Sequence, residues 1–405
     1  MTGGTKQAVV IGGSMSGLLS GISLRRAGWD VDIYERVEGE LSGRGAGIVA
    51  QQELIERLRK LGFATGDLGV QIATRKIIDA RGRITEQFEC PQVLTAWERV
   101  YRLLRDAFPP ERYHRGRGLA KLTQTPDQVT AHFSDGETIE ADVLVGADGI
   151  RSTVRQQCLP EAKPLYAGYS AWRALIAESA FPPDTHRELF EYMSFGLPSG
   201  EQFLGYPVAG PDNDLRPGHR RYNVVWYRPA DEHTKLQWLL TDDSGKTHAI
   251  SIPPPLIRRD AIAEMRADAE RLLAPHFRQI VRLIDELILQ PIYDLESPRM
   301  AFGRVATVGD AAFVARPHVA AGVSKAADDA AALVGALQAE SDVVAALKRY
   351  EAARLRENYR IIERARHLGA FLQATKTQEE QARAGRHSTD SAVIAETATL
   401  DFLYT

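Results

Sequence analysis

A glycine-rich segment near the start of the chain has the residue types and spacing to bind a dinucleotide. It reads Gly12-Gly13-Ser14-Met15-Ser16-Gly17, and Glu35 follows at the end of the next apolar run. A glycine turn lets a strand enter a helix tightly, and the free N–H groups at the helix N-terminus can bind a pyrophosphate. The acid can accept hydrogen bonds from ribose hydroxyls. Ser14 replaces the second glycine of the G-x-G-x-x-G pattern, although its small hydroxyl can itself contact phosphate. A glycine turn that binds nothing is the alternative.

Two acidic residues next to glycine stand directly after later apolar runs. Asp148 follows Val143–Val145 in a Gly-Ala-Asp-Gly sequence, and Asp310 follows Val305–Val308 in a Gly-Asp-Ala-Ala sequence. In α/β folds, ligands bind beyond the carboxyl ends of the strands, so both acids are candidates for contacts to a bound cofactor. An ordinary Asp-Gly turn before a helix is the alternative for Asp148.

The residues after Asp310 can complete such a site. Pro317 and His318 precede Gly322-Val323-Ser324, which begins a helical pattern. The first N–H groups of a helix stabilise negative charge, so this segment suits the ring of a reduced cofactor. Imidazole titrates near neutral pH, which makes His318 a candidate substrate-orienting group or proton acceptor. A hydrogen-bonded structural histidine is the alternative.

These segments need a sheet and helices to position them. Ala8–Ile11, the helical pattern of Met15–Ala27 and Val31–Tyr34 make a βαβ unit, which is the usual start of a doubly wound α/β sheet. Between Tyr166 and Arg228, aromatic and β-branched runs alternate with Pro/Gly-rich connections, which is typical of an antiparallel sheet. Val343–Gln373 has the charge-rich amphipathic pattern of a long helix.

The three segments, in this order and at these separations, resemble the class A flavoprotein monooxygenases of the para-hydroxybenzoate hydroxylase type. The resemblance runs from about residue 7 to about residue 345 of the sequence. It implies that the glycine turn and Glu35 bind the diphosphate side of FAD, that Asp148 lies near FAD and the path of the nicotinamide nucleotide, and that Asp310 holds the ribitol chain. Five segments are most similar to the branch of the family that hydroxylates dihydroxypyridines: Val9 with Ile11–Ser14, Leu41–Val49, Phe108–His114, Tyr166–Arg173 and Arg316–His318.

The resemblance also implies the domain organisation. We predict an α/β protein with a doubly wound, Rossmann-like FAD-binding domain, an antiparallel-sheet substrate domain and C-terminal helices. The predicted FAD-binding domain is discontinuous and comprises residues 1–75, 96–165 and 295–345. The predicted substrate domain comprises 76–95 and 166–294, and the C-terminal helix and tail comprise 346–405.

The predicted cofactor contacts come from these segments and their neighbours. They are Gly12, Gly13, Ser14, Met15, Ser16, Gly17, Glu35, Arg36, Arg44, Gly47, Ile48, Arg102, Asp148, Asp310, Pro317, Gly322, Val323 and Ser324. Solvated surface charge is the alternative for Arg44 and for Arg102. The motifs require no attachment residue, so we expect FAD to be bound non-covalently.

The predicted catalytic residues are His318, Tyr169 and Tyr206. Both tyrosines lie on expected strands that should cover the flavin ring, with core packing as the alternative for each. In the family, NADH or NADPH reduces the flavin. A C4a-hydroperoxide with an electrophilic distal oxygen then attacks a ring made electron-rich by ionisation of a hydroxyl. This chain has no second glycine-rich βαβ unit, so we expect the nicotinamide nucleotide to bind transiently. The predicted substrate is a dihydroxypyridine-like ring, with a phenolic acid of the salicylate or hydroxybenzoate type as the alternative.

Composition excludes several other classes of protein. The net charge is −3, from 50 Lys+Arg against 53 Asp+Glu, which gives no electrostatic case for a nucleic-acid or anionic-membrane partner. Cys90 and Cys158 lack the spacing of a disulfide framework or a zinc site, and we predict no metal. No 18-residue apolar stretch occurs. We therefore expect a cytoplasmic enzyme whose partners are a small aromatic substrate and O2. A homodimer is compatible with the sequence.

Two rival functions are compatible with an FAD-binding fold. Tryptophan halogenases carry a W-x-W-x-I-P segment, whereas the five tryptophans of this chain are isolated. A non-catalytic FAD-binding regulator would need a DNA-binding or basic segment, and the sequence has none that we recognise. Both rivals are therefore less favoured than a monooxygenase.

Overall fold

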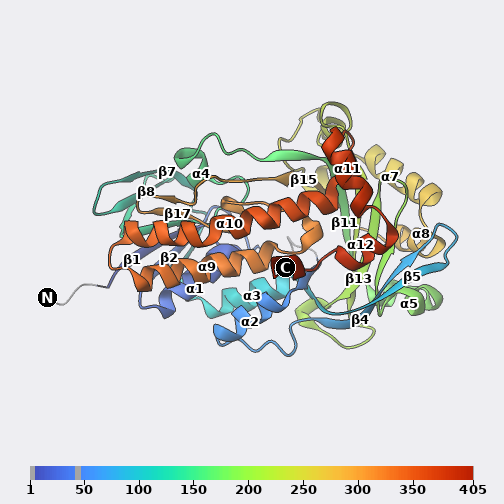
Figure 1. Cartoon of the computed structure of the whole chain (residues 1–405), viewed down its shortest axis with the longest axis horizontal. Coiled ribbons are helices and arrows are strands. Elements are labelled where there is room, and N and C mark those ends of the chain that lie inside the picture. Colours follow the sequence, from blue (N-terminus) through green and yellow to red (C-terminus); the bar gives the residue numbers. More distant parts are fainter. Residues whose placement is uncertain (1–4, 42–46, 405) are drawn as a thin grey trace.

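The predicted βαβ unit lies at the centre of a six-stranded sheet (Figure 1). The structure is a computed structural model, and it describes residues 5–41 and 47–404. Strand order is β16-β17-β10-β1-β2-β6, and all pairs except β16–β17 are parallel. The strands are β1 (Gln7–Ile11), β2 (Asp30–Glu35), β6 (Tyr113–Arg115), β10 (Val143–Gly146), β16 (Ala301–Phe302) and β17 (Val305–Thr307).

The strand register brings the three predicted binding segments to one edge of this sheet. Ile11 pairs with Gly146 on one side and with Tyr34 on the other, and Gly146 pairs with Thr307. The glycine turn, the Asp148 segment and the Asp310 segment therefore leave the sheet at the same level. This edge is the carboxyl end of the parallel strands, where α/β folds bind ligands.

The two faces of the six-stranded sheet are covered differently. Apolar residues of one face pack against five helices in a single core. The other face packs against a separate three-stranded antiparallel sheet, which was not predicted from the sequence. The helices are α1 (Met15–Arg26), α2 (Gln52–Lys60), α3 (Trp97–Ala107), α9 (Gly322–Ala339) and α10 (Val343–Gly369), and the strands are β7 (Leu119–Gln124), β8 (Val129–Phe133) and β9 (Thr138–Ala141).

The predicted antiparallel sheet has eight strands in the order β15-β11-β14-β13-β12-β4-β5-β3. Only the β12–β4 pair is parallel. One face packs against helices α5 (Pro183–Leu189), α7 (Arg259–Leu272) and α8 (Pro275–Arg282). The strands are β3 (Gly47–Ala50), β4 (Val70–Ile78), β5 (Ile84–Ala96), β11 (Leu165–Ala177), β12 (Met193–Gly196), β13 (Gln202–Val208), β14 (Arg221–Pro229) and β15 (Ile288–Asp294).

Strands β3 and β4 lie in the eight-stranded sheet. However, β3 and most of β4 fall within the range 1–75, which was assigned to the FAD-binding part. The division of the chain into domains stays a prediction. Two further short helices are α4 (Thr153–Cys158) and α6 (Gln237–Leu239). Across residues 5–41 and 47–404, no helix is both long enough and apolar enough to cross a membrane.

The C-terminal residues fold back over the eight-stranded sheet. Helix α10 continues into α11 (Gln378–His387) and α12 (Asp390–Glu396), and α12 packs on β4 and β5. Buried Arg75 on β4 donates to the carbonyl oxygens of Ile394 and Thr397 at 2.8 and 2.6 Å. This guanidinium therefore ties the end of α12 to the sheet.

Candidate active site

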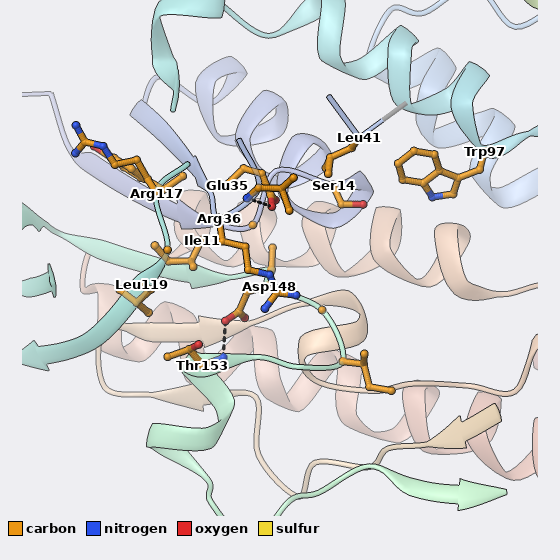
Figure 2. Close-up of a pocket in the computed structure, with 17 residues that line it drawn as sticks. Ile11, Ser14, Glu35, Arg36, Leu41, Trp97, Arg117, Leu119, Asp148 and Thr153 are labelled. Atoms are coloured by element: carbon orange, nitrogen blue, oxygen red, sulfur yellow. Dashed lines mark hydrogen bonds between the residues drawn. The ribbon is translucent and has the colours of Figure 1, made fainter. Parts of the chain in front are cut away.

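Two adjoining cavities of about 320 Å³ each contain most of the predicted site residues. The first, here the nucleotide cavity, lies at the carboxyl edge of the six-stranded sheet (Figure 2). The second, here the ring cavity, lies between the start of helix α9 and the eight-stranded sheet. Ser14 and Trp97 line both cavities. Two cavities joined in this way suit an extended ligand that places one part in each cavity.

The glycine turn makes room for close approach at the nucleotide cavity. Gly12 has φ +105°, and a Cβ there would collide with the carbonyl of Ala147. A Cβ on Gly13 would collide with the Tyr113 hydroxyl, and one on Gly17 with the carbonyl of Gly12. Glycine is thus required at all three positions by backbone conformation or by space.

The start of helix α1 is open to a ligand. Ser14 is the N-cap residue, and its side chain makes no capping hydrogen bond. The first N–H groups of the helix therefore stay available at the cleft, and they carry the positive end of the helix dipole. A diphosphate is the ligand group that such a turn accommodates.

Two carboxylates stand on either side of the nucleotide cavity (Figure 2). Buried Glu35 accepts hydrogen bonds from the backbone N–H of Gly13 at 2.8 Å and of Val37 at 2.9 Å, which fixes its position at the end of β2. Asp148 accepts from the Thr153 N–H at 2.7 Å with one oxygen, while its other oxygen is buried without a partner. Burial raises the pKa of the Asp148 carboxyl.

Asp310 lies in the wall of the ring cavity and is exposed to it. The enclosing protein and the negative charge of nearby Asp329 raise the pKa of the Asp310 carboxyl, against the opposing charges of Lys325 and Arg155. A carboxyl that faces a cavity in this way can accept hydrogen bonds from hydroxyl groups of a ligand.

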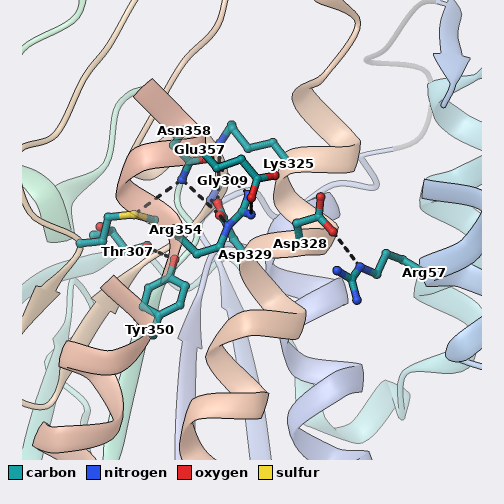
Figure 3. Close-up of polar contacts among 11 residues, drawn as sticks. Arg57, Thr307, Gly309, Lys325, Asp328, Asp329, Tyr350, Arg354, Glu357 and Asn358 are labelled. Atoms are coloured by element: carbon teal, nitrogen blue, oxygen red, sulfur yellow. Dashed lines mark hydrogen bonds and ion pairs between the residues drawn. The ribbon is translucent and has the colours of Figure 1, made fainter. Parts of the chain in front are cut away.

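A buried polar network holds the loop that carries Asp310 (Figure 3). Asp329 on helix α9 accepts from the Gly309 N–H at 2.9 Å and from Arg354 Nε on helix α10 at 2.8 Å. Asn358 donates to the same carboxylate at 3.2 Å, and Lys325 Nζ lies 3.7 Å from it. Two helices thereby fix the backbone from which Asp310 projects.

The ring cavity has a roof on the eight-stranded sheet and a floor at the start of helix α9. Tyr206 and Tyr227 line the roof on neighbouring strands β13 and β14, and burial raises the pKa of both hydroxyls. The floor is the loop before α9, where Ala320 has φ +50° and Gly322 begins the helix. A non-glycine residue in this conformation is strained, and such strain is common where a loop is held for function.

His318 lies in this floor and is 2% exposed. Its Nε2 atom is 2.8 Å from the hydroxyl of Tyr169, which is completely buried. Burial, assisted by the charge of Arg316, lowers the pKa of the imidazole from 6.5 to about 3. His318 is therefore neutral at physiological pH and is a weak base.

The sequence-predicted residues divide into groups in the structure. Arg36 lines the nucleotide cavity together with Gly12, Ser14, Glu35 and Asp148. The ring cavity is lined by Ser14, Met15, Ser16, Gly47, Ile48, Tyr206, Asp310, Pro317, His318, Gly322 and Val323. Gly13, Gly17, Tyr169 and Ser324 lie behind these walls, and Arg44 lies outside the described residues.

Arg102 is not brought to either cavity. Its half-exposed side chain pairs with Glu98 at 2.7 Å and with Asp212 at 3.1 Å, in a separate surface hollow. Among residues 5–41 and 47–404, no contact supports a cofactor role for Arg102. Helical periodicity does not tell which exposed arginine of a helix faces a cleft, and Trp97 takes that place instead.

Several residues that line the ring cavity were not predicted from the sequence. Trp97 joins the two cavities and stacks on Tyr101, with ring centroids 5.0 Å apart. Arg173 and Gln290 lie in the roof, and Thr397 with Ala398 closes one side. A basic residue inside an aromatic strand pattern, as at Arg173, was the available signal.

The described residues fit FAD. The glycine turn leaves space for a diphosphate, and Glu35 and Asp148 offer carboxylate oxygens beside it. One oxygen of Asp148, which lines the nucleotide cavity, has no partner, as expected of a group that awaits a ligand. The open start of helix α9 suits the negative charge of a reduced flavin ring. These features define a flavoprotein with its substrate space over the ring.

Comparisons with known proteins agree with this class. A family model described as FAD binding domain-like matches residues 166–294. The 2,6-dihydroxypyridine 3-monooxygenase of Paenarthrobacter nicotinovorans is 33% identical over 370 residues, which cover 91% of this chain and 92% of that protein. The structure of 2,6-dihydroxypyridine-3-hydroxylase from Arthrobacter nicotinovorans matches with a TM-score of 0.86 and 32% identity, covering 92% of this chain and 94% of that chain. Klebsiella pneumoniae HpxO, complexed with FAD and uric acid, shares the fold with a TM-score of 0.75 and 23% identity, covering 95% and 93%.

The chain belongs to the family of FAD-dependent aromatic monooxygenases. It is an oxidoreductase with FAD as cofactor and NAD(P)H as reductant, as the motifs predicted. The predicted fold class is confirmed as well: a Rossmann-like FAD-binding fold, an antiparallel sheet and C-terminal helices.

Proposed function

We propose that the enzyme hydroxylates a hydroxylated N-heteroaromatic ring of the dihydroxypyridine kind. The observation that carries this proposal is the ring cavity, whose 320 Å³ suit one small ring over a flavin. Its walls combine aromatic groups with a few polar ones, among them His318, Arg173 and Gln290. The similarity to 2,6-dihydroxypyridine 3-monooxygenase supports the same substrate class. A phenolic acid is the second candidate, because 3-amino-4-hydroxybenzoate 2-monooxygenase of Streptomyces cremeus is 29% identical.

The chain's own residues have distinct tasks in this proposal. The turn at Gly12 and Ser14 holds the diphosphate, Glu35 and Asp148 flank the nucleotide, and Asp310 accepts from the ribitol hydroxyls. Bound FAD supplies the activation of O2 once NADH or NADPH has reduced it. The roof tyrosines and the C-terminal segment cover the ring cavity and exclude water from it. Reduction by NAD(P)H is consistent with a cytoplasmic location, which we also propose.

His318 has an orienting task in this proposal. It lies in the floor with one imidazole nitrogen engaged by Tyr169, so the ring can present its other nitrogen to a substrate hydroxyl. Because its pKa is about 3, a stable imidazolium is unfavourable at neutral pH. His318 therefore positions the hydroxyl and does not store its proton.

A panel of ring compounds tests the substrate class. NAD(P)H oxidation is followed with 2,6-dihydroxypyridine, 6-hydroxynicotinate, 3-amino-4-hydroxybenzoate and salicylate, and products are analysed by mass. We expect 2,6-dihydroxypyridine to stimulate oxidation and to give a product heavier by one oxygen atom. Stimulation by a phenolic acid alone would select the second candidate. No hydroxylated product from any ring would contradict the proposed substrate classes.

A further inference from the structure

We propose that Arg173 is an anion-binding residue of the ring cavity, and that the substrate binds against it as an anion. This inference rests on the proposed function and specifies the charge state that the site selects. Arg173 lies on β11, between two strands of the roof, and its side chain lines the cavity together with Gln290.

The guanidinium of Arg173 has only neutral partners among the residues described. It donates to Gln290 Oε1 at 2.7 Å and to the carbonyl oxygen of Gly47 at 3.3 Å. Its Nε–H is buried and has no partner. Burial of a cation without a counter-ion, and of a donor without an acceptor, costs free energy. An anionic ligand in the cavity would reduce the cost of the unpaired charge.

The other ionisable groups that face the cavity do not compensate this charge. Arg316 forms its own buried ion pair with Asp294 at 2.8 Å. Asp310 belongs to the loop before helix α9, next to the Lys325–Asp329 network. Tyr206, Tyr227 and His318 are the remaining titratable groups of the described lining, and they are neutral near pH 7. Among the described residues, the guanidinium of Arg173 thus forms no ion pair at the roof of the cavity.

An ionised hydroxypyridine has the chemistry to balance this charge. Loss of a proton from a 2-hydroxypyridine spreads negative charge over the oxygen and the adjacent ring nitrogen. A planar guanidinium recognises neighbouring acceptors of this kind better than an ammonium does, because its donors form a rigid fork. Gln290 holds the guanidinium in the roof, where the side chain of Arg173 lines the cavity.

Binding measurements on the FAD-loaded enzyme test the inference without turnover. The probes are 2,6-dihydroxypyridine and its neutral ether 2,6-dimethoxypyridine, titrated through the absorbance change of the bound flavin. We expect the wild type to prefer the hydroxy compound, with an affinity that falls as the pH drops below the compound's own pKa in solution. Arg173→Gln should weaken its binding by about 10- to 100-fold, as for a lost hydrogen bond to a charged group. The affinity of Arg173→Lys for the hydroxy compound should lie between those of the wild type and of Arg173→Gln. The affinity of each variant for the ether should equal that of the wild type.

A matched arginine on the same sheet provides the control. Arg221 on β14 is partly buried but lines the separate surface hollow and not the ring cavity, so Arg221→Gln should leave both affinities unchanged. Unchanged binding of the hydroxy compound by Arg173→Gln would overturn the inference. Loss of FAD by this variant, with unchanged ring affinity in the flavin-loaded fraction, would assign Arg173 to the cofactor instead. The proposed function fails separately, if the wild type gives no hydroxylated product.

Discussion

Replacement of His318 by glutamine separates an orienting role from a proton-accepting role. A glutamine amide can still bond to the Tyr169 hydroxyl, which lies 2.8 Å from His318 Nε2, but it cannot take up a proton. Replacement by alanine removes both functions, including the hydrogen bond to the buried Tyr169 hydroxyl. Both variants therefore lack a proton acceptor at this position, and they differ in whether the hydrogen bond to Tyr169 can form.

The lowered pKa sets the expected size of the effect. With a pKa of about 3, protonation of His318 at pH 7 costs on the order of 5 kcal/mol. General base catalysis contributes about 10²- to 10⁴-fold when the base titrates near the working pH, a condition that His318 does not meet. We expect His318→Gln to keep hydroxylation within about 10-fold of wild type. His318→Ala should consume NAD(P)H with more H2O2 and less product, and should lose about 1–3 kcal/mol of stability.

Stability measurements check the pKa itself. Between pH 6.5 and about 3, His318 is protonated in the unfolded chain but not in the folded chain. The free energy of unfolding therefore decreases as the pH falls below 6.5. Chemical unfolding at pH 7.5 and at pH 5 should show wild type losing about 2 kcal/mol more than His318→Gln. Two results together would show that His318 is a proton acceptor after all. The first is a loss of hydroxylation of 100-fold or more in His318→Gln with normal FAD content. The second is a decrease of the wild-type rate with an apparent pKa near 6.5.

Three further outcomes are expected. Acid precipitation of the yellow protein should leave all of its FAD in the supernatant, and flavin that stays with the precipitate would contradict non-covalent binding. Asp310→Ala should weaken FAD binding by roughly 1.5–3 kcal/mol in equilibrium titrations of the apoprotein, whereas unchanged affinity in a folded variant would exclude the ribitol contact. Arg75→Met should lower the free energy of unfolding by about 2–5 kcal/mol, because it leaves the carbonyls of Ile394 and Thr397 without their donor; unchanged stability would show that the C-terminal segment is held by packing alone.

The cofactor part of the site could be predicted because its signals are local. The turn after Ile11, the acid at Glu35 and the Asp148 and Asp310 segments each follow an apolar strand within a few residues. Parallel strands that pair in register bring such segments to one edge automatically. Sequence order and strand pairing together were sufficient for this part.

The substrate part could not be predicted in the same way, because it depends on the direction of side chains across distant elements. Arg102 and Trp97 lie on the same helix, yet only Trp97 faces the cleft. The environment of Arg173 depends on Gln290, which is far along the chain, and its hydrogen-bond partners among the described residues are neutral. The partners of Arg75 are backbone carbonyls near the C-terminus, which have no sequence signature.

Arg173 and His318 together lead to a last prediction, on the pH dependence of hydroxylation. If His318 is too weak a base, the ring hydroxyl must ionise because a cation stabilises the anion, and Arg173 supplies that cation. Loss of the cation should raise the apparent pKa of the bound hydroxyl by about 1–3 units, so Arg173→Gln should need a higher pH for the same kcat/KM. His318→Gln should leave this acidic limb in place, and the double variant should follow Arg173→Gln. A limb that moves in His318→Gln but not in Arg173→Gln would reverse the two roles.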